Sequence, residues 1–142
     1  MEMTQETFAK GECQCGNIKY TVTGNPALSA QCHCTDCQKA SGTGHMSNAF
    51  FREDDVIISG NFGEYTVTSD AGNQLVRRFC PTCGNRAHGT NSGRPGMVNI
   101  PVGIFEDNSW FSPQVVVYTK NRHAWDITST EVPNFERMPP PK

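Results

Sequence analysis

The chain has 142 residues, seven of them cysteine, and its 12 Lys and Arg side chains against 14 Asp and Glu give a formal net charge of −2. This length fits one domain, which can bury a core without needing disulfides for stability. The lack of a strong basic field argues against nucleic acid as a partner. Cysteine makes up about 5% of the residues, below the roughly 8–10% of short disulfide scaffolds, and an odd number excludes complete internal pairing.

The sequence contains no apolar run of about 18 residues, so we expect neither a membrane-spanning helix nor a membrane partner. The first twelve residues are polar and lack the apolar segment of a signal peptide. We therefore expect a cytoplasmic protein, whose thiols stay reduced. Clustered cysteines in such a protein bind metal more often than they pair.

Short stretches of alternating apolar and polar residues predict strands along most of the chain. The first is 18–22, which ends at Asn25-Pro26. A helix is expected over 35–41, ended by Gly42. Further strands are expected over residues 46–51, 56–59, 62–68, 74–79, 97–102 and 115–119.

Turn residues join two of these strands into a predicted hairpin, because 69–73 reads Ser-Asp-Ala-Gly-Asn between 62–68 and 74–79. The proline-rich end, residues 133–142, is expected to form a loose tail. Short strands with turn residues between them predict a single, mainly antiparallel all-β domain over residues 1–142.

The cysteines fall into three clusters with the spacing of metal ligands. These are Cys13 and Cys15 before Gly16, then Cys32, Cys34 and Cys37, and finally Cys80 and Cys83 before Gly84. A tight turn points two thiolates at one ion, and a glycine lets the backbone bend round it. Three such clusters in one chain strongly favour zinc.

The number of ligands suggests how the clusters combine. A structural zinc takes four ligands, normally from two clusters. The two pairs together fit this count as a closed site formed by Cys13, Cys15, Cys80 and Cys83. The remaining group of three, with an open fourth position, has the arrangement of a catalytic zinc.

Other combinations remain open at this point. A histidine, His33, His45 or His88, would close the group of three as a second structural site, or the clusters would mix. A redox-active C-x-x-C is a further reading, but the βαβ setting of that motif is not visible in the sequence.

Three segments carry a resemblance to a known family. They are Gly11 to Gly16 (GECQCG), Cys32 to Gln38 (CHCTDCQ) and Phe79 to Gly84 (FCPTCG). In these segments the chain resembles the glutathione-dependent formaldehyde-activating enzyme family, which includes the centromere protein V group. The likeness continues through Val98-Asn99-Ile100-Pro101-Val102-Gly103 to Trp125 and Val132-Pro133-Asn134-Phe135, and so spans a core of about 10–137.

The resemblance implies a β-tent fold built around zinc sites, with two zinc ions per chain. It implies a structural zinc at Cys13, Cys15, Cys80 and Cys83 and a second, functional zinc at Cys32, Cys34 and Cys37. The activity it implies joins glutathione, a small-molecule thiol, to formaldehyde, a small aldehyde, to give S-hydroxymethylglutathione. We therefore expect a carbon–sulfur lyase or synthase with a role in detoxification.

Histidine and arginine side chains are the other candidates for this chemistry. His33 lies between two expected ligands and His45 follows Gly42 and Gly44, so both are candidate catalytic residues beside the group of three cysteines. His88 and His123 are expected to serve packing or the surface. Arg77 and Arg78 lie next to each other on a strand, so at most one of them faces a pocket.

Two other function classes remain open. The first is a non-catalytic zinc module that binds a protein or nucleic acid, and steep salt dependence of DNA binding would identify it. The second is a sensor of thiol or metal stress, which would release zinc reversibly on mild oxidation without turning over thiol adducts.

Overall fold

Two β-sheets account for most of the structure in a computed structural model, which describes residues 6–139. The ten strands of this part of the chain are β1 (Ala9–Glu12), β2 (Lys19–Val22), β3 (Leu28–Cys32), β4 (Met46–Arg52), β5 (Val56–Ser59), β6 (Gly63–Thr68), β7 (Gln74–Phe79), β8 (Arg86–Asn91), β9 (Met97–Pro101) and β10 (Val115–Val117). Its helices are α1 (Thr35–Ser41) and the 3-10 turns η1 (Glu53–Asp55), η2 (Val102–Ile104) and η3 (Thr119–Asn121).

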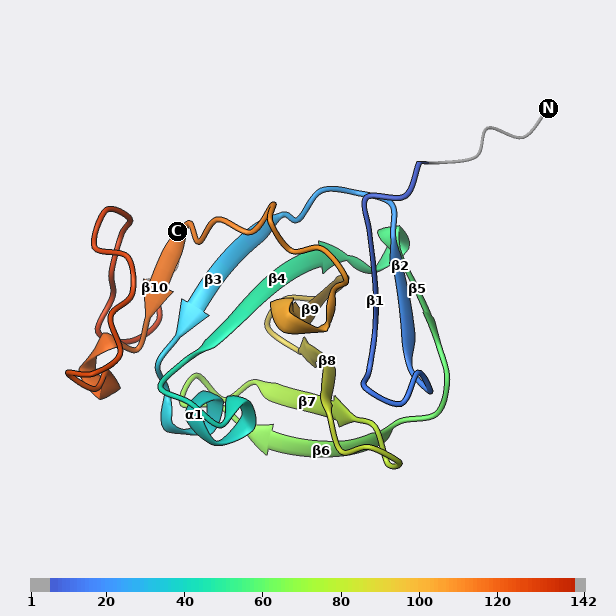
Figure 1. Ribbon diagram of the computed structural model, residues 1–142. Coiled ribbons are helices and arrows are strands. Elements are labelled where there is room, and N and C mark those ends of the chain that lie inside the picture. The colour runs from blue at the N-terminus through green and yellow to red at the C-terminus, as the bar shows by residue number, and fades with distance from the viewer. Residues whose placement is uncertain (1–5, 140–142) are drawn as a thin grey trace.

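The strands form one sheet in the order β1-β2-β5 and a second in the order β10-β3-β4-β9-β8-β7-β6. Every strand pair is antiparallel except β10 with β3, which is parallel. In Figure 1, β3 with β4, β6 with β7, and the small sheet form three sides of a triangle around β8 and β9. The mainly antiparallel all-β fold with short helical turns is confirmed.

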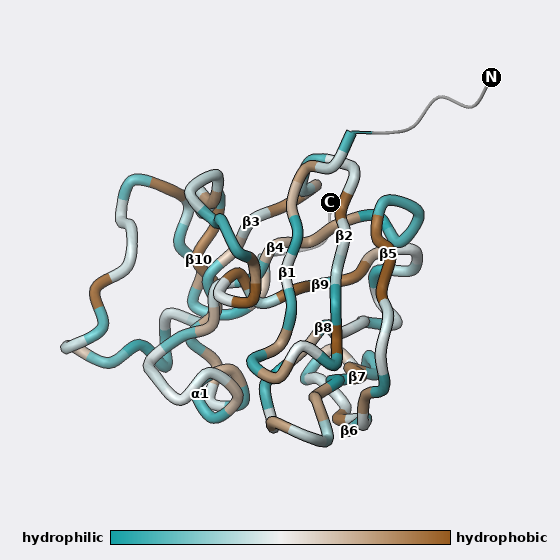
Figure 2. Tube along the Cα trace, turned by 45° about the vertical axis from the view of Figure 1, so that its right-hand side comes forward, coloured by the Kyte–Doolittle hydropathy of each residue, from teal (hydrophilic) through white to brown (hydrophobic). Residues whose placement is uncertain are grey.

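The core lies between the small sheet and the middle of the large one. Ile18, Tyr20 and Val22 alternate with exposed or half-buried residues, so one face of β2 is buried against Phe51 and Ile100 of the large sheet. Each such side chain contributes about 1.5–3 kcal/mol to the free energy of folding. Figure 2 shows apolar stretches along β2, β5 and β9, which line this core.

Helix α1 occupies the predicted residues because both of its ends are capped. The Cys34 sulfur accepts a hydrogen bond from the Cys37 backbone N–H at the first turn, and Gly42 ends the helix in the left-handed conformation. No helix within residues 6–139 has the length and apolar character needed to cross a membrane.

Strands β1, β3 and β8 were not predicted, because their residues do not alternate cleanly. Strand β8, for example, reads RAHGTN and is held between β7 and β9. The predicted hairpin of 62–68 with 74–79 is present as β6 and β7, with Gly63 opposite Phe79. Two predicted strands are shorter than expected, because residues 102 and 119 belong to the turns η2 and η3.

The chain beyond residue 133 differs from the loose tail that we expected. Val116 donates its backbone N–H to Pro133 and accepts a hydrogen bond from Phe135, so this segment runs beside β10. Backbone hydrogen bonds along β10 and the turn η3 continue to Arg137. The end of the predicted tail, 140–142, lies outside the described residues.

Candidate metal centres

Two turns bring four cysteines together. Cys13 and Cys15 lie in the turn between β1 and β2, and Cys80 and Cys83 lie in the turn between β7 and β8. Their sulfur atoms all lie within 4.8 Å of one another, and we call this group the four-cysteine centre. The turns belong to different sheets, so the centre joins the two sheets at one end of the core.

Both turns have the same local construction. The Gly16 N–H donates to the Cys13 carbonyl at 2.9 Å, and the Gly84 N–H donates to the Cys80 carbonyl at 2.8 Å. Each glycine has a positive φ, 81° at Gly16 and 79° at Gly84, which a side chain would make costly. This conformation reverses the chain within the reach of two thiols, as the sequence indicated.

The spacing of the sulfurs fits a tetrahedral zinc. The Cys15 sulfur lies 3.7 Å from that of Cys13 and 3.6 Å from that of Cys80. Sulfurs at the corners of a tetrahedron with zinc–sulfur bonds of about 2.3 Å are about 3.8 Å apart, whereas a disulfide needs about 2.05 Å. All seven cysteines of the chain are free.

Backbone N–H groups donate hydrogen bonds to two of these sulfurs. The Ile18 N–H donates to the Cys13 sulfur at 3.2 Å, and the Cys83 N–H donates to the Cys80 sulfur at 3.4 Å. The bond from Cys83 is the largest contribution that lowers the pKa of Cys80, to about 5. Donors of this kind orient a thiolate ligand and stabilise its charge.

Three more cysteines meet where β3 passes into α1. Cys32 is the last residue of β3, Cys34 caps the helix, and Cys37 lies in its first turn. Their sulfurs also lie within 4.8 Å of one another, and we call this group the three-cysteine centre. Among residues 6–139, no His, Asp or Glu belongs to either sulfur group, so the structure brings together the same two sets that spacing suggested.

Protons are shared unevenly in the three-cysteine centre. Hydrogen bonding with Cys32, and then with Cys37, lowers the pKa of Cys34 to about 3. Hydrogen bonding with Cys34, and then with Cys37, raises the pKa of Cys32. The first thiolate therefore forms easily, whereas three thiolates at this spacing require a cation. All-sulfur donors and half-buried positions fit zinc.

Two arginines place positive charge beside the three-cysteine centre. Arg77 lies close enough to contribute to lowering the pKa values of Cys34 and Cys37, and its guanidinium is 3.3 Å from the Asp36 carboxylate. Burial, followed by the charge of Arg77, lowers the pKa of Arg86 to about 10, so Arg86 keeps its charge at neutral pH.

Tyr118 follows β10, whose last residue, Val117, pairs with Cys32 of the three-cysteine centre. Its hydroxyl donates to Asp70 Oδ2 at 3.0 Å, and its backbone has a left-handed φ of 57°, which is uncommon for a residue with a side chain. Burial and the bond to Asp70 raise its pKa to about 12, with smaller contributions from Cys32 and Cys34. The phenol therefore stays protonated at neutral pH.

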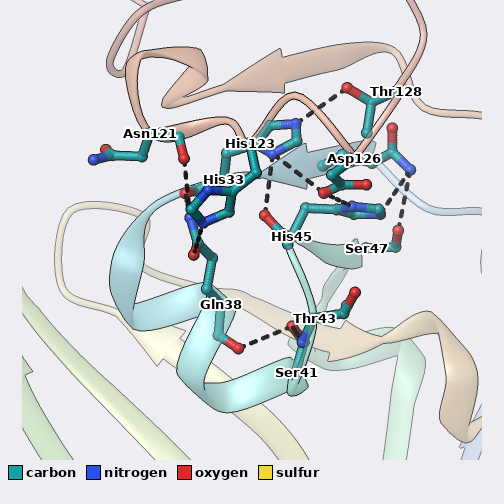
Figure 3. Close-up of polar contacts among 12 residues, drawn as sticks. His33, Gln38, Ser41, Thr43, His45, Ser47, Asn121, His123, Asp126 and Thr128 are labelled. Carbon is teal, nitrogen blue, oxygen red and sulfur yellow. Dashed lines mark hydrogen bonds and ion pairs between the residues drawn. The ribbon is translucent and has the colours of Figure 1, made fainter.

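The structure places His33 and His45 away from these sulfurs. Side chains alternate along β3, which places Gln31 on the face opposite Cys32, and the ring of His33, the residue after Cys32, contacts the Gly44 carbonyl and Thr128. His45 lies on that opposite face too, with its Nε2 atom 3.4 Å from Gln31 Nε2. Figure 3 shows both histidines directed at Asp126. Our expectation that they border the three-cysteine centre is therefore corrected.

The remaining candidates lie elsewhere. Arg77 and Arg78 face different partners, as strand alternation requires, and Arg78 bonds Glu64 and Thr90. His88 is buried, with its Nδ1 atom 2.9 Å from the Tyr20 hydroxyl. Arg78 and His88 line a pocket of about 300 Å³ that contains no cysteine. His123 is exposed and stacks on Trp125.

Sequence reasoning did not identify Asp36, Arg86, Tyr118 or Asp126. Asp36 lies between two cysteine ligands, which is a local signal that could have identified it. Asp126 bonds His45 across 81 positions of the chain, so no local pattern points to it.

Comparisons with known proteins identify a family and a similar fold. The family model described as "Glutathione-dependent formaldehyde-activating enzyme" matches residues 8–121. A crystal structure of a Rhodobacter sphaeroides protein is 24% identical, with a TM-score of 0.55, over 68% of this chain and 87% of that chain. At this identity the likeness concerns the fold alone. No curated protein matches the chain.

Proposed function

Because the chain belongs to the glutathione-dependent formaldehyde-activating enzyme family, we propose that it is a zinc-dependent carbon–sulfur lyase or synthase that interconverts glutathione plus formaldehyde with S-hydroxymethylglutathione. The observation that carries this proposal is a group of three thiols with an arginine and a tyrosine beside it. We further propose two zinc ions per chain, one held by each cysteine centre, and a cytoplasmic location.

The reaction is an addition to a carbonyl. The glutathione sulfur forms a bond to the formaldehyde carbon, the carbonyl π bond breaks, and the thiol proton ends on the new hydroxyl oxygen. The reverse direction breaks the carbon–sulfur bond and regenerates both reactants. Cys32, Cys34 and Cys37 would hold a zinc ion by their three thiolates, and such an ion would lower the pKa of a substrate thiol that binds beside them.

Arg77 is our candidate for binding the substrate. Glutathione carries two carboxylates, and a guanidinium presents paired N–H donors that match a carboxylate. The Arg77 side chain is 19% exposed, and Asp36 orients it at 3.3 Å. Arg77 thus presents a fixed positive charge at the edge of the three-cysteine centre, where a bound anionic thiol would meet it.

Tyr118 and Asp70 are our candidates for moving the proton. The reaction needs an acceptor for the thiol proton and a donor to the new oxygen. A carboxylate and a protonated phenol joined by a hydrogen bond of 3.0 Å supply both functions. The charges of Cys32 and Cys34 contribute to raising the pKa of Tyr118, which supports assigning this pair to the three-cysteine centre.

The proposal is tested by the exchange rate between glutathione and its adduct. The zinc-replete protein is mixed with glutathione and formaldehyde, and exchange is measured by NMR against the uncatalysed reaction. We expect acceleration that depends on protein concentration. Acceleration with cysteine but not with glutathione would show that glutathione is not the substrate. No acceleration with any small thiol would contradict an enzymatic role.

A further inference from the structure

A third group of candidate metal ligands lies on the face of β3 and β4 opposite the three-cysteine centre. It consists of His33 immediately after β3, His45 immediately before β4, and Asp126 in the loop after η3. One ligand atom from each lies within 4.8 Å of the others. Figure 3 shows the two rings and the carboxylate converging from three separate segments of the chain.

The distances between these atoms suit one shared ion. Asp126 Oδ2 is 2.7 Å from His45 Nδ1 and 3.5 Å from His33 Nδ1. The Gly44 carbonyl oxygen is 3.1 Å from His33 Nδ1. Four ligands with bonds of about 2.0–2.1 Å around a tetrahedral ion are about 3.3 Å apart, within the range of these separations.

The outer nitrogen of each histidine also meets a polar group. His33 Nε2 lies 3.1 Å from Thr128 Oγ1, which can accept its proton when Nδ1 binds an ion. His45 Nε2 lies against the amide of Gln31, whose Oε1 atom is buried without a hydrogen-bond partner among the described residues. A half-turn of this amide would direct that oxygen at the His45 ring. Outer partners of this kind accompany most metal-binding histidines.

The carboxylate of Asp126 is largely buried beside the two histidines. The His33 side chain is fully buried and that of Asp126 is 11% exposed. Among residues 6–139, Asp126 forms ion pairs only with the two histidines. A carboxylate so removed from water needs a compensating cation. A Cβ atom on Gly44 would collide with the Asp126 carboxyl group, so a glycine here lets the carboxylate approach both rings.

We propose that His33, His45 and Asp126, with the Gly44 carbonyl, form a third metal site that binds a divalent transition-metal ion such as Zn²⁺. Two imidazoles and two oxygens make a harder donor set than the thiolates of the other centres, so the site also accepts Co²⁺. Access is from the side of His45, whose side chain is 21% exposed. A bound ion would fasten the loop after η3 to β3 and β4.

The experiment adds Co²⁺ to the full-length protein whose thiolate centres are already filled with zinc. Metal per chain is counted by elemental analysis after gel filtration, and the absorption spectrum is recorded. We expect one further equivalent, with the visible d–d bands of cobalt and without a thiolate-to-cobalt charge-transfer band. If no further equivalent binds, or if that band appears, the proposal is overturned.

Substitutions then test whether the additional cobalt ion binds to these residues. Asp126→Asn and His45→Gln should each weaken it at least about tenfold, and Thr128→Val should weaken it by about 10–100-fold. Asp54→Asn and His123→Gln change exposed side chains outside the group and should keep it. Retention in both Asp126→Asn and His45→Gln, or loss in the two controls, would overturn the assignment. The number of cobalt ions bound by the wild-type protein tests the proposal without any variant. The proposal can therefore still be overturned if a variant fails to fold.

Discussion

The guanidinium of Arg77 lies 3.3 Å from the carboxylate of Asp36, and this pair connects β7 to the first turn of α1. Asp36 lies between Cys34 and Cys37 in the sequence, so the pair holds a positive charge against the three-cysteine centre. The next residue, Arg78, points to the other face of β7 and bonds Glu64. A substitution of Arg77 therefore tests its role in substrate binding, and the same substitution of Arg78 serves as the control.

Arg77→Gln should raise the KM for glutathione about tenfold or more. A charge-assisted hydrogen bond contributes about 1.5–3 kcal/mol, and about 1.4 kcal/mol corresponds to a factor of ten. Steady-state kinetics with varied glutathione measures the effect, and the zinc content should not change. Arg78→Gln should leave the KM near the wild-type value. Equal effects of the two substitutions would remove Arg77 from the substrate site.

Tyr118→Phe should lower kcat by about 100-fold while changing the KM little, because proton transfer by a positioned side chain contributes about 10²–10⁴-fold. The substitution keeps the ring and removes the hydroxyl that bonds Asp70. Tyr65→Phe, at an exposed tyrosine of β6, is the control. If kcat of Tyr118→Phe stays within a factor of two of wild type, proton transfer does not involve this hydroxyl.

Cys83→Ser should destabilise the whole domain. The four-cysteine centre joins the turns of two sheets, and binding of a structural zinc contributes directly to folding. Loss of several kcal/mol should lower the melting temperature by about 10 °C or more. Circular dichroism on heating measures this shift. A Cys83→Ser protein that melts like wild type would show that the centre is not structural.

Stability should also fall in mild acid because of His88. Burial, with the charges of Arg78 and Arg86, lowers its pKa to about 4, whereas in the unfolded chain it is about 6.5. The unfolded state therefore binds more protons between these values, so the free energy of unfolding falls as pH decreases from about 6.5 towards 4.

Urea unfolding at pH 7 and pH 5, with zinc present, measures this dependence. His88→Gln should lose less stability than wild type between the two values, since glutamine does not titrate. His123→Gln, at an exposed histidine, should behave like wild type. An unchanged pH dependence in His88→Gln would show that the buried imidazole is not its source.

Local signals predicted the elements whose ends are marked in the sequence. Gly42 and the Cys34 cap delimit α1, and the turn at 69–73 sets the register of β6 with β7. Strand β3 is not bounded by a capping or turn residue of this kind. Its pairing with β10 joins Ala30 to Val115, a long-range parallel contact that only the folded chain provides.

The difference between local signals and long-range contacts also explains which sites could be predicted. The cysteines could be grouped because each turn holds its ligands two or three positions apart. The group of His33, His45 and Asp126 could not be predicted, because it depends on the loop after η3 folding back over β4. Tyr118 likewise reaches Asp70 across 48 positions, with no periodic pattern to indicate the contact.

Zinc content and adduct exchange, measured on the same preparation of Cys34→Ser, test the central claim most directly. We predict that this variant stays folded, loses the zinc of the three-cysteine centre and no longer accelerates exchange between glutathione and S-hydroxymethylglutathione. A Cys34→Ser protein that retains the wild-type zinc content and full turnover would contradict the assignment of this centre as the site of reaction.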